Sequence, residues 1–434
     1  MLETKRLKKL INMIEKLIAY NDTEVAGVLN RVDSENYVFS YEVSWLESKA
    51  PQPLSLTLPL QEGVFSPDAT KVFFANLLPE GQLRDHIASK SRISPDDDFA
   101  LLVQLAGDCA GAIALYPEGK VPLAANQQQR YRTLSGEDLG LLFNEAYIMD
   151  PTFLGAEEKT RLSLAGVQDK LPITIQNHEY KLPLDGAPST HILKPQNHRF
   201  DSLVENELFC MTLAKAVNLD VPETFMLSHE GDTGYVVERY DRFIDEDNTI
   251  TRIHQEDFCQ ATGTSYRLKY EEKGGPGHKA CFDVIKECRK PLADRIKLVN
   301  QVVFNYLIGN ADCHAKNTSL LYSEGTRPDL APFYDLVCTA VYPSLSQKLA
   351  MSIGGEFDPR KISKQSWERF SQEIGDSSAK PTLKAVERLG GDVLEKVKGV
   401  SDELIERYGE NPIYDELVRT ITGKANTALR QIQN

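Results

Sequence analysis

The stretch that most constrains this chain is residues 301–317, with the sequence QVVFNYLIGNADCHAKN. It opens with an apolar run that is typical of a buried helix, and Gly309 is placed to end that helix as a C-terminal cap. The polar side chains that follow are those of Asn310, Asp312, His314 and Asn317. Polar groups beside a buried helix cost free energy unless they have partners, so the stretch predicts either a hydrogen-bonded cap or a functional site.

Two of these residues, Asp312 and Asn317, have the Asp-to-Asn spacing of the protein-kinase catalytic loop. In that loop the Asp accepts the proton of the substrate hydroxyl and the Asn binds a magnesium ion. A second carboxylate, Asp335, follows in APFYDLV, where the preceding aromatic residues predict a strand end. Together these residues favour a phosphoryl-transfer site. The alternative is that Asp312 and His314 cap the helix and bond each other.

Length, charge and cysteine content narrow the class of protein. A chain of 434 residues is long enough for two or three domains. Its net charge of −14 argues against a general nucleic-acid coat. The seven cysteines form no C-x-x-C pair, which favours reduced thiols in the cytoplasm over a disulfide framework or a zinc site. No apolar run approaches the roughly 20 residues that span a bilayer, and we expect no membrane contact.

The N-terminal part of the chain is patterned mainly for strands. Residues 1–15 predict a short amphipathic helix, and alternating apolar residues within 16–60 predict several strands. The segment SLTLPL at 55–60 is interpreted as a further strand. Residues 99–116 predict a helix, a Gly/Asp loop and a strand, and the polar stretch 117–135 predicts a linker.

The middle of the chain holds candidate phosphate-binding features. Residues 161–175 predict two strands around a small-residue loop, where Gly166 allows the backbone close to a ligand. An ordinary hairpin is the alternative for this loop. Lys194 stands alone among apolar residues of a predicted strand, and either pairs with a phosphate or is an edge lysine whose ammonium reaches solvent.

Three later stretches complete the secondary-structure prediction. An amphipathic helix is predicted over 202–219, and its Glu205 and Glu207 are candidates to pair with Lys194 as the helix glutamate does in kinases. Residues 234–243 predict a strand that runs into charged residues, as in the connection between kinase lobes. From residue 278 onward the pattern is helical, interrupted by strands around 318–353.

Taken in order, these motifs closely resemble the HipA family, the serine/threonine kinase toxins of bacterial type II toxin–antitoxin modules. The resemblance covers about residues 17–355. The motifs that carry it are PLSLTLPL at 53–60, FFANLLPEG at 73–81, SLAGVQDKL at 163–171, HILKP at 191–195, VERYDR at 237–242, QEDFCQ at 255–260, GGPG at 274–277, GNADCHAKN at 309–317 and PFYDL at 332–336.

The resemblance implies an α+β, two-lobed protein-kinase-like fold with a β-rich N-terminal lobe and a mainly helical C-terminal lobe. The implied divisions are a helical extension over 1–15, an N-terminal subdomain over 16–125, a kinase N-lobe with nucleotide loop and hinge over 126–240, and a helical C-lobe over 241–434.

The resemblance also implies roles for single residues. Asp312 would be the catalytic base, Asn317 and Asp335 the metal ligands, and Ser163 the serine that the kinase phosphorylates on itself. The family usually has Ala where this chain has Val167. The implied nucleotide-binding residues are Ala165, Gly166, Val167, Gln168, Asp169, Lys170, Lys194, Glu238, Arg239, Tyr240, His314, Ala315, Lys316, Asn317, Tyr334 and Asp335.

By the same resemblance the chain would use ATP and Mg²⁺ in the cytoplasm. Its partners would be a small helix-turn-helix antitoxin, operator DNA reached mainly through that antitoxin, and a protein substrate such as the glutamyl aminoacyl-tRNA synthetase. Three alternatives stay open. They are a repressor scaffold bound to the antitoxin with little kinase activity, a small-molecule kinase, and a metal hydrolase built on Asp312, His314 and Asp335, which lacks a second histidine ligand.

Overall fold

The computed structural model describes residues 15–105, 107–122, 130–143, 170–196 and 199–433. The predicted helix over 1–15 therefore lies outside the described residues, apart from residue 15. The same holds for Ser163 and for the first strand and loop of the 161–175 prediction.

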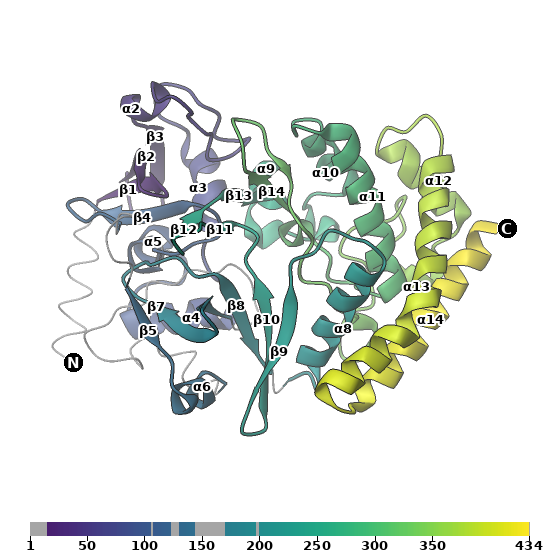
Figure 1. Ribbon diagram of the computed structural model, residues 1–434. Coiled ribbons are helices and arrows are strands. Elements are labelled where there is room, and N and C mark those ends of the chain that lie inside the picture. The colour runs from purple at the N-terminus through teal and green to yellow at the C-terminus, as the bar shows by residue number, and fades with distance from the viewer. Residues whose placement is uncertain (1–14, 106, 123–129, 144–169, 197–198, 434) are drawn as a thin grey trace.

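The N-terminal part is a four-stranded antiparallel sheet in the order β3-β2-β1-β4 (Figure 1). Its strands are β1 (Lys16–Asn21), β2 (Glu24–Arg31), β3 (Tyr37–Tyr41) and β4 (Ile113–Pro117). Helices α2 (Val43–Leu46), α3 (Pro67–Ala75), α4 (Gly81–Ser91) and α5 (Asp98–Leu105) accompany this sheet. Of the strands predicted within 16–60, those up to residue 41 are confirmed, as are the helix, loop and strand predicted over 99–116.

The strand predicted over 55–60 is wrong. This segment has only an isolated bridge between Ser55 and Leu58. The Ser55 hydroxyl and the Leu56 N–H both donate to the buried carboxylate of Glu256, and these two bonds hold the segment in a turn.

A second, six-stranded sheet has the order β5-β7-β6-β8-β10-β9 and forms the middle of the molecule. Its strands are β5 (Tyr131–Thr133), β6 (Leu171–Gln176), β7 (Glu179–Pro183), β8 (His191–Pro195), β9 (Thr224–His229) and β10 (Asp232–Glu238), with α6 (Gly136–Leu142) near β9. Residues 131–133 of the predicted 117–135 linker thus form a strand, because Arg132 and its neighbours pair with β7.

Helix α8 (Leu203–Ala216) lies between the six-stranded sheet and the helical lobe. The amphipathic character predicted over 202–219 is wrong, since even the polar Asn206 and Glu207 are buried. The helix packs on strands on one side and on C-terminal helices on the other, so it offers hardly any face to solvent.

Short strands connect the two lobes. They are β11 (Arg242–Ile244) paired with β12 (Ile250–Arg252), and the sheet β13 (His254–Asp257), β14 (Ser319–Tyr322) and β15 (Asp329–Leu330). A one-turn helix, α9 (Phe258–Ala261), follows β13. The strand end expected at Asp335 is wrong, because β15 stops at Leu330 and Asp335 lies in the following loop.

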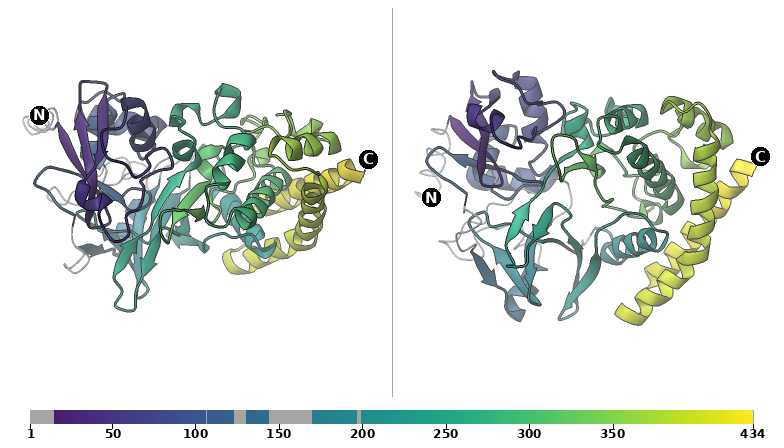
Figure 2. Two further views of the ribbon diagram at one scale, coloured as in Figure 1. Left: turned by 90° about the horizontal axis from the view of Figure 1, so that it is seen from above. Right: turned by 45° about the horizontal axis from the view of Figure 1, so that its top comes forward.

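The C-terminal lobe is helical, as predicted. It contains α10 (His278–Ile285), α11 (Pro291–Ile308), α12 (Lys364–Glu373), α13 (Lys380–Tyr408) and α14 (Pro412–Gln433). Helices α13 and α14 lie side by side at the end of the molecule farthest from the N-terminal sheet (Figure 2). No helix of the described residues is both long enough and apolar enough to cross a bilayer.

Candidate active site

The loop after α11 is arranged by its own amides. Gly309 ends the helix with a left-handed φ of 75°, as its position predicted. The side-chain oxygen of Asn310 accepts the Asp312 N–H at 3.0 Å, and the Asn317 side-chain amide donates to the Asp312 carbonyl at 3.1 Å. The backbone that carries Asp312 is therefore fixed from both sides.

The Asp312 carboxylate does not bond the ring of His314, so the capping alternative fails in its predicted form. Its Oδ1 instead accepts the hydroxyl of Tyr270 at 2.7 Å. Burial raises the pKa of Asp312, and the bond from Tyr270 opposes that rise. His314 is buried, and burial together with Lys269 lowers its pKa to about 3, so the ring is neutral. Among the described residues, the buried His314 Nδ1 has no partner.

Lys194 joins the two lobes of the site. It lies on β8 and its ammonium is 2.7 Å from Glu207 Oε1 on α8 and 2.7 Å from Asp335 Oδ1. Burial lowers the pKa of Lys194, but the two carboxylates outweigh burial and hold it above its usual value. Glu207 is thus the residue that pairs with Lys194. The other candidate, Glu205, bonds Asn411.

Asp335 has a left-handed φ of 60°, a conformation in which non-glycine residues are uncommon. Such a backbone costs on the order of 1 kcal/mol or more and is most often kept at functional positions. Burial raises the pKa of the Asp335 carboxyl, but Lys194 and Lys170 outweigh burial and hold it well below its ordinary value. The carboxylate is therefore ionised and faces two cations.

Only one residue of the predicted nucleotide loop is described. Lys170 directly precedes β6, and burial together with the charge of Lys194 lowers its pKa to about 8. Ser163, Ala165, Gly166, Val167, Gln168 and Asp169 lie outside the described residues.

The predicted metal ligands carry suitable donor atoms. The Asn317 amide nitrogen is used on the Asp312 carbonyl, which leaves the amide oxygen for a cation. Asp335 supplies an ionised carboxylate whose charge acts on Asp312, and the Asp312 carbonyl in turn holds the Asn317 amide. Magnesium in kinases takes one or two protein oxygens and completes its shell with phosphate and water, so this pair fits. Among the described residues no cluster of three His, Cys, Asp or Glu side chains forms a metal site made wholly of protein ligands.

The predicted hinge, Glu238 to Tyr240, begins at the last residue of β10. The Glu238 N–H donates to the Glu223 carbonyl at 2.9 Å and the Arg239 N–H to the Thr190 carbonyl at 2.8 Å. Neither N–H is therefore available to the adenine ring of a nucleotide. Tyr240 stands 5.8 Å from Tyr334, measured between ring centroids. The Tyr334 hydroxyl bonds the Lys316 carbonyl, which leaves an aromatic pair as the surface near the hinge.

Three of the predicted nucleotide-binding residues have side chains that are packed away from the site. The Lys316 ammonium is buried against Asn76 and Asp257, and Ala315 is fully buried in the core. The guanidinium of Arg239 lies in a buried network. The side chains of these residues support the site from behind and do not line it.

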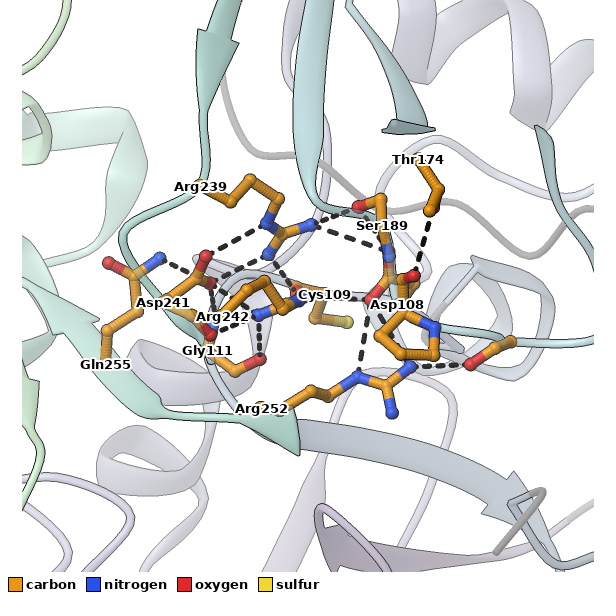
Figure 3. A network of polar contacts seen from close by, with 12 residues as sticks. Asp108, Cys109, Gly111, Thr174, Ser189, Arg239, Asp241, Arg242, Arg252 and Gln255 are labelled. Atoms are coloured by element: carbon orange, nitrogen blue, oxygen red, sulfur yellow. Dashed lines mark hydrogen bonds and ion pairs between the residues drawn. The ribbon is translucent and has the colours of Figure 1, made fainter. Parts of the chain in front are cut away.

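That network ties the predicted hinge to the N-terminal part of the chain (Figure 3). Arg239 and Arg242 both pair with Asp241, and both reach Asp108 in the loop after α5. Arg252 on β12 also approaches Asp108, at 3.4 Å. All five side chains are at most 5% exposed, so the charges are neutralised by each other and hardly by solvent.

Sequence reasoning missed Tyr270 and this arginine cluster. Tyr270 lies just before the motif GGPG at 274–277, and that proximity is the one signal that could have drawn attention to it. Arg239, Asp241 and Arg242 lie in the VERYDR motif at 237–242, but nothing local links them to Asp108, which is more than 100 residues away in the sequence.

Comparison with known proteins decides the family. Residues 162–399 match the model of the HipA-like C-terminal domain, and residues 17–116 match the HipA N-terminal domain. The chain belongs to the HipA family. The C-terminal match contains Lys194, Glu207 and Asp335, and the N-terminal match covers all but the two end residues of the four-stranded sheet.

Relatives in the HipA family cover most of the chain. The protein Y4mE of Sinorhizobium fredii, named as a kinase, is 36% identical over 93% of this chain and 96% of its own length. The serine/threonine-protein kinase toxin HipA of Shewanella oneidensis is 33% identical over 79% of each chain. These relatives therefore support kinase activity for this member of the HipA family.

A solved structure of Shewanella oneidensis HipA, in complex with HipB and operator DNA, matches this fold with a TM-score of 0.79. The match has 27% sequence identity and covers 96% of both chains. The two-lobed α+β fold expected from the sequence is thereby confirmed.

Proposed function

We propose that this chain is a serine/threonine protein kinase toxin that transfers the γ-phosphate of ATP to a protein serine. The observation that carries the proposal is Lys194, held between Glu207 and Asp335 at 2.7 Å from each. A lysine paired with a helix glutamate, next to a metal-binding aspartate, is the arrangement that protein kinases need for activity. Asp312 lies in the same site and supplies the base.

Each residue has a definite task in this reaction. Asp312 accepts the proton of the substrate hydroxyl while that oxygen bonds to the γ-phosphorus and the bond to ADP breaks. Asn317 and Asp335 would hold Mg²⁺, which when bound neutralises phosphate charge. Lys194 and Lys170 place positive charge where the phosphates would lie. The neutral His314 ring offers an unpartnered Nδ1 in the same site.

The hinge and the loop are assigned by the family resemblance. We propose that the Tyr240–Tyr334 pair contacts the adenine and that the nucleotide loop comprises residues 165–170. Ser163 is the proposed autophosphorylation site, where a phosphate would add about −1.5 to −2 charge beside the nucleotide and favour release of the loop. The proposed divisions of the chain remain 16–125, 126–240 and 241–434.

The proposed partners come from the family. The Shewanella structure contains HipB and operator DNA, and an antitoxin of that kind is the partner we propose here. A net charge of −14 disfavours phosphate binding by this chain alone, so the antitoxin would supply most of the affinity for DNA. An aminoacyl-tRNA synthetase such as the glutamyl enzyme is the proposed substrate in the cytoplasm, and its modification would inhibit translation.

The test is phosphate transfer by the purified chain. With Mg²⁺ and ATP labelled on the γ-phosphate, the parent should label a protein serine, and Asp312→Asn should not, although it should fold and bind ATP. A parent that binds ATP but transfers no phosphate to any protein would favour the repressor scaffold. Labelling of small molecules alone would favour a small-molecule kinase.

A further inference from the structure

A tyrosine outside the kinase motifs contacts the proposed base. The Tyr270 hydroxyl donates to Asp312 Oδ1 at 2.7 Å, and its ring meets the His314 ring edge-on with centroids 5.2 Å apart. The other carboxylate oxygen, Oδ2, has no hydrogen-bond partner in the described part of the chain. One oxygen of the base is thus held and the other is open.

The position of Tyr270 is fixed by the same segment that fixes the catalytic loop. The Glu271 N–H donates to the Ala350 carbonyl at 3.1 Å, and the Ala350 N–H donates to the Ala311 carbonyl at 2.9 Å. The Glu271 carboxylate accepts both the N–H and the hydroxyl of Ser352. The residues next to Tyr270 and Asp312 are therefore both hydrogen-bonded to the backbone of Ala350.

The GGPG motif makes this placement possible. A Cβ on Gly275 would lie 1.8 Å from the Leu268 carbonyl oxygen, and one on Gly277 would lie 2.8 Å from the Glu271 carboxylate. The Gly275 N–H also donates to the Tyr270 carbonyl at 3.0 Å. Only glycine lets the chain turn this closely over the residues that hold Tyr270.

Two ammonium groups steady the ring of Tyr270. Lys269 and Lys273 stand 5.7 and 5.4 Å from its centroid, within the range of a cation–π contact. Lys269 is itself fixed by an ion pair with the buried Glu80 at 2.8 Å. The Tyr270 ring thus contacts two ammonium groups and the His314 ring, and its hydroxyl donates to Asp312 Oδ1.

We propose that Tyr270 is a positioning residue for Asp312, which rests on the proposed kinase function. The terminal torsion of an aspartate is broad, so a free carboxylate would sample many orientations. The hydroxyl bond to Oδ1 selects one of them and presents Oδ2 to the substrate hydroxyl. Tyr270 thus acts on the reaction through Asp312 and touches neither nucleotide nor metal in this role.

The variant that tests this is Tyr270→Phe, which keeps the ring and removes only the hydroxyl. The matched control is Tyr266→Phe, because the Tyr266 hydroxyl bonds Arg267 and not Asp312. The assay uses Mg²⁺, ATP labelled on the γ-phosphate, and the Asp312→Asn chain as an acceptor that cannot phosphorylate itself. Labelling rates give kcat and the KM for ATP, and thermal unfolding reports on the fold.

Tyr270→Phe should lower kcat on the order of tenfold, the effect of one lost hydrogen bond to a charged group, with KM for ATP and the unfolding temperature unchanged. Tyr266→Phe should match the parent. An unchanged or raised kcat in Tyr270→Phe would overturn the inference and leave the proposed function standing. A raised kcat would mean that the Tyr270 hydroxyl inhibits Asp312. An inactive parent would overturn both.

A second pair of variants tests the support of Tyr270. Gly275→Ala should lower kcat with little effect on the KM for ATP, because the added Cβ must push the segment away from Leu268. Gly274→Ala controls for backbone strain, since its position has φ 90° but no atom within 4 Å of a Cβ. Equal losses of kcat in both variants would show that the close approach at Gly275 does not support Tyr270.

Discussion

At the scale of single residues, Asp335 is one of the two carboxylates that hold Lys194 in the site. Asp335→Asn should weaken Mg²⁺-dependent ATP binding at least tenfold, because the amide is a poorer ligand for a hard cation and no longer balances Lys194. Titration of a fluorescent ATP analogue with and without Mg²⁺ measures this. Asp329→Asn, a change in a carboxylate that pairs with Arg289 on the surface, is the control. Equal Mg²⁺ dependence in Asp335→Asn and the parent would remove Asp335 from the metal site.

Lys170 gives a second prediction at this scale, on stability against pH. Burial and Lys194 lower its pKa from 10.5 to about 8, so the folded chain gives up this proton more easily than the unfolded chain does. Below about pH 8 both states are protonated and the folded state bears the full cost of the buried charge. Between pH 8 and 10.5 the unfolded state binds more protons, so stability gains with rising pH.

Lys170→Met removes that buried charge. The variant should therefore be more stable than the parent at pH 7, by on the order of 1 kcal/mol, and the difference should shrink by pH 9.5. Urea unfolding at both pH values measures it, with the exposed Lys286→Met as control. A difference that is the same at both values would contradict the lowered pKa of Lys170.

At the scale of elements, Gly309 connects the end of α11 to the loop that carries Asp312. Its φ of 75° disfavours any side chain, and a Cβ there would lie 2.5 Å from Lys424 and 2.9 Å from Ala340. Gly309→Ala should destabilise the fold by about 1–2 kcal/mol and lower kcat, because the chain that carries Asp312 must shift. Gly391→Ala, in the exposed interior of α13, should instead stabilise by about 0.5–1 kcal/mol. Chemical unfolding and labelling rates separate the two.

The same scale shows what local sequence can predict. The helix before Gly309 and the strands before residue 42 follow from apolar periodicity and turn residues, which act over a few neighbours. Helix α8 could not be recognised as buried all round, because the layers on its two sides come from distant segments. The turn at 55–58 depends on Glu256, about 200 residues away, and so does not follow from its alternating pattern. The sequence predicts only that Glu205 or Glu207 pairs with Lys194, because the choice depends on how α8 packs against β8.

At the scale of the whole molecule, the buried cluster of Figure 3 makes the N-terminal sheet part of the kinase. Asp108 accepts from Arg242 at 2.9 Å and also pairs with Arg239 and Arg252, so it serves three arginines, of which Arg239 and Arg242 also pair with Asp241. Although burial raises the pKa of Asp108, the arginines outweigh burial and hold it below its usual value. The carboxylate is ionised, and its loss would leave buried positive charge unbalanced.

Asp108→Asn should therefore destabilise the fold by about 3–5 kcal/mol, the usual cost of removing one partner from a buried ion pair. Urea unfolding should show this loss in a single transition that includes the kinase lobes, since Arg239 lies in the proposed hinge and Arg242 lies just after it. Asp283→Asn, which breaks only exposed pairs on α10, should change stability by less than about 0.5 kcal/mol. Two separate transitions in Asp108→Asn, with the N-terminal sheet unfolding first and the hinge intact, would show that the sheet is an independent domain. A single shifted transition would mean that the hinge needs the N-terminal sheet in place to keep its charges paired.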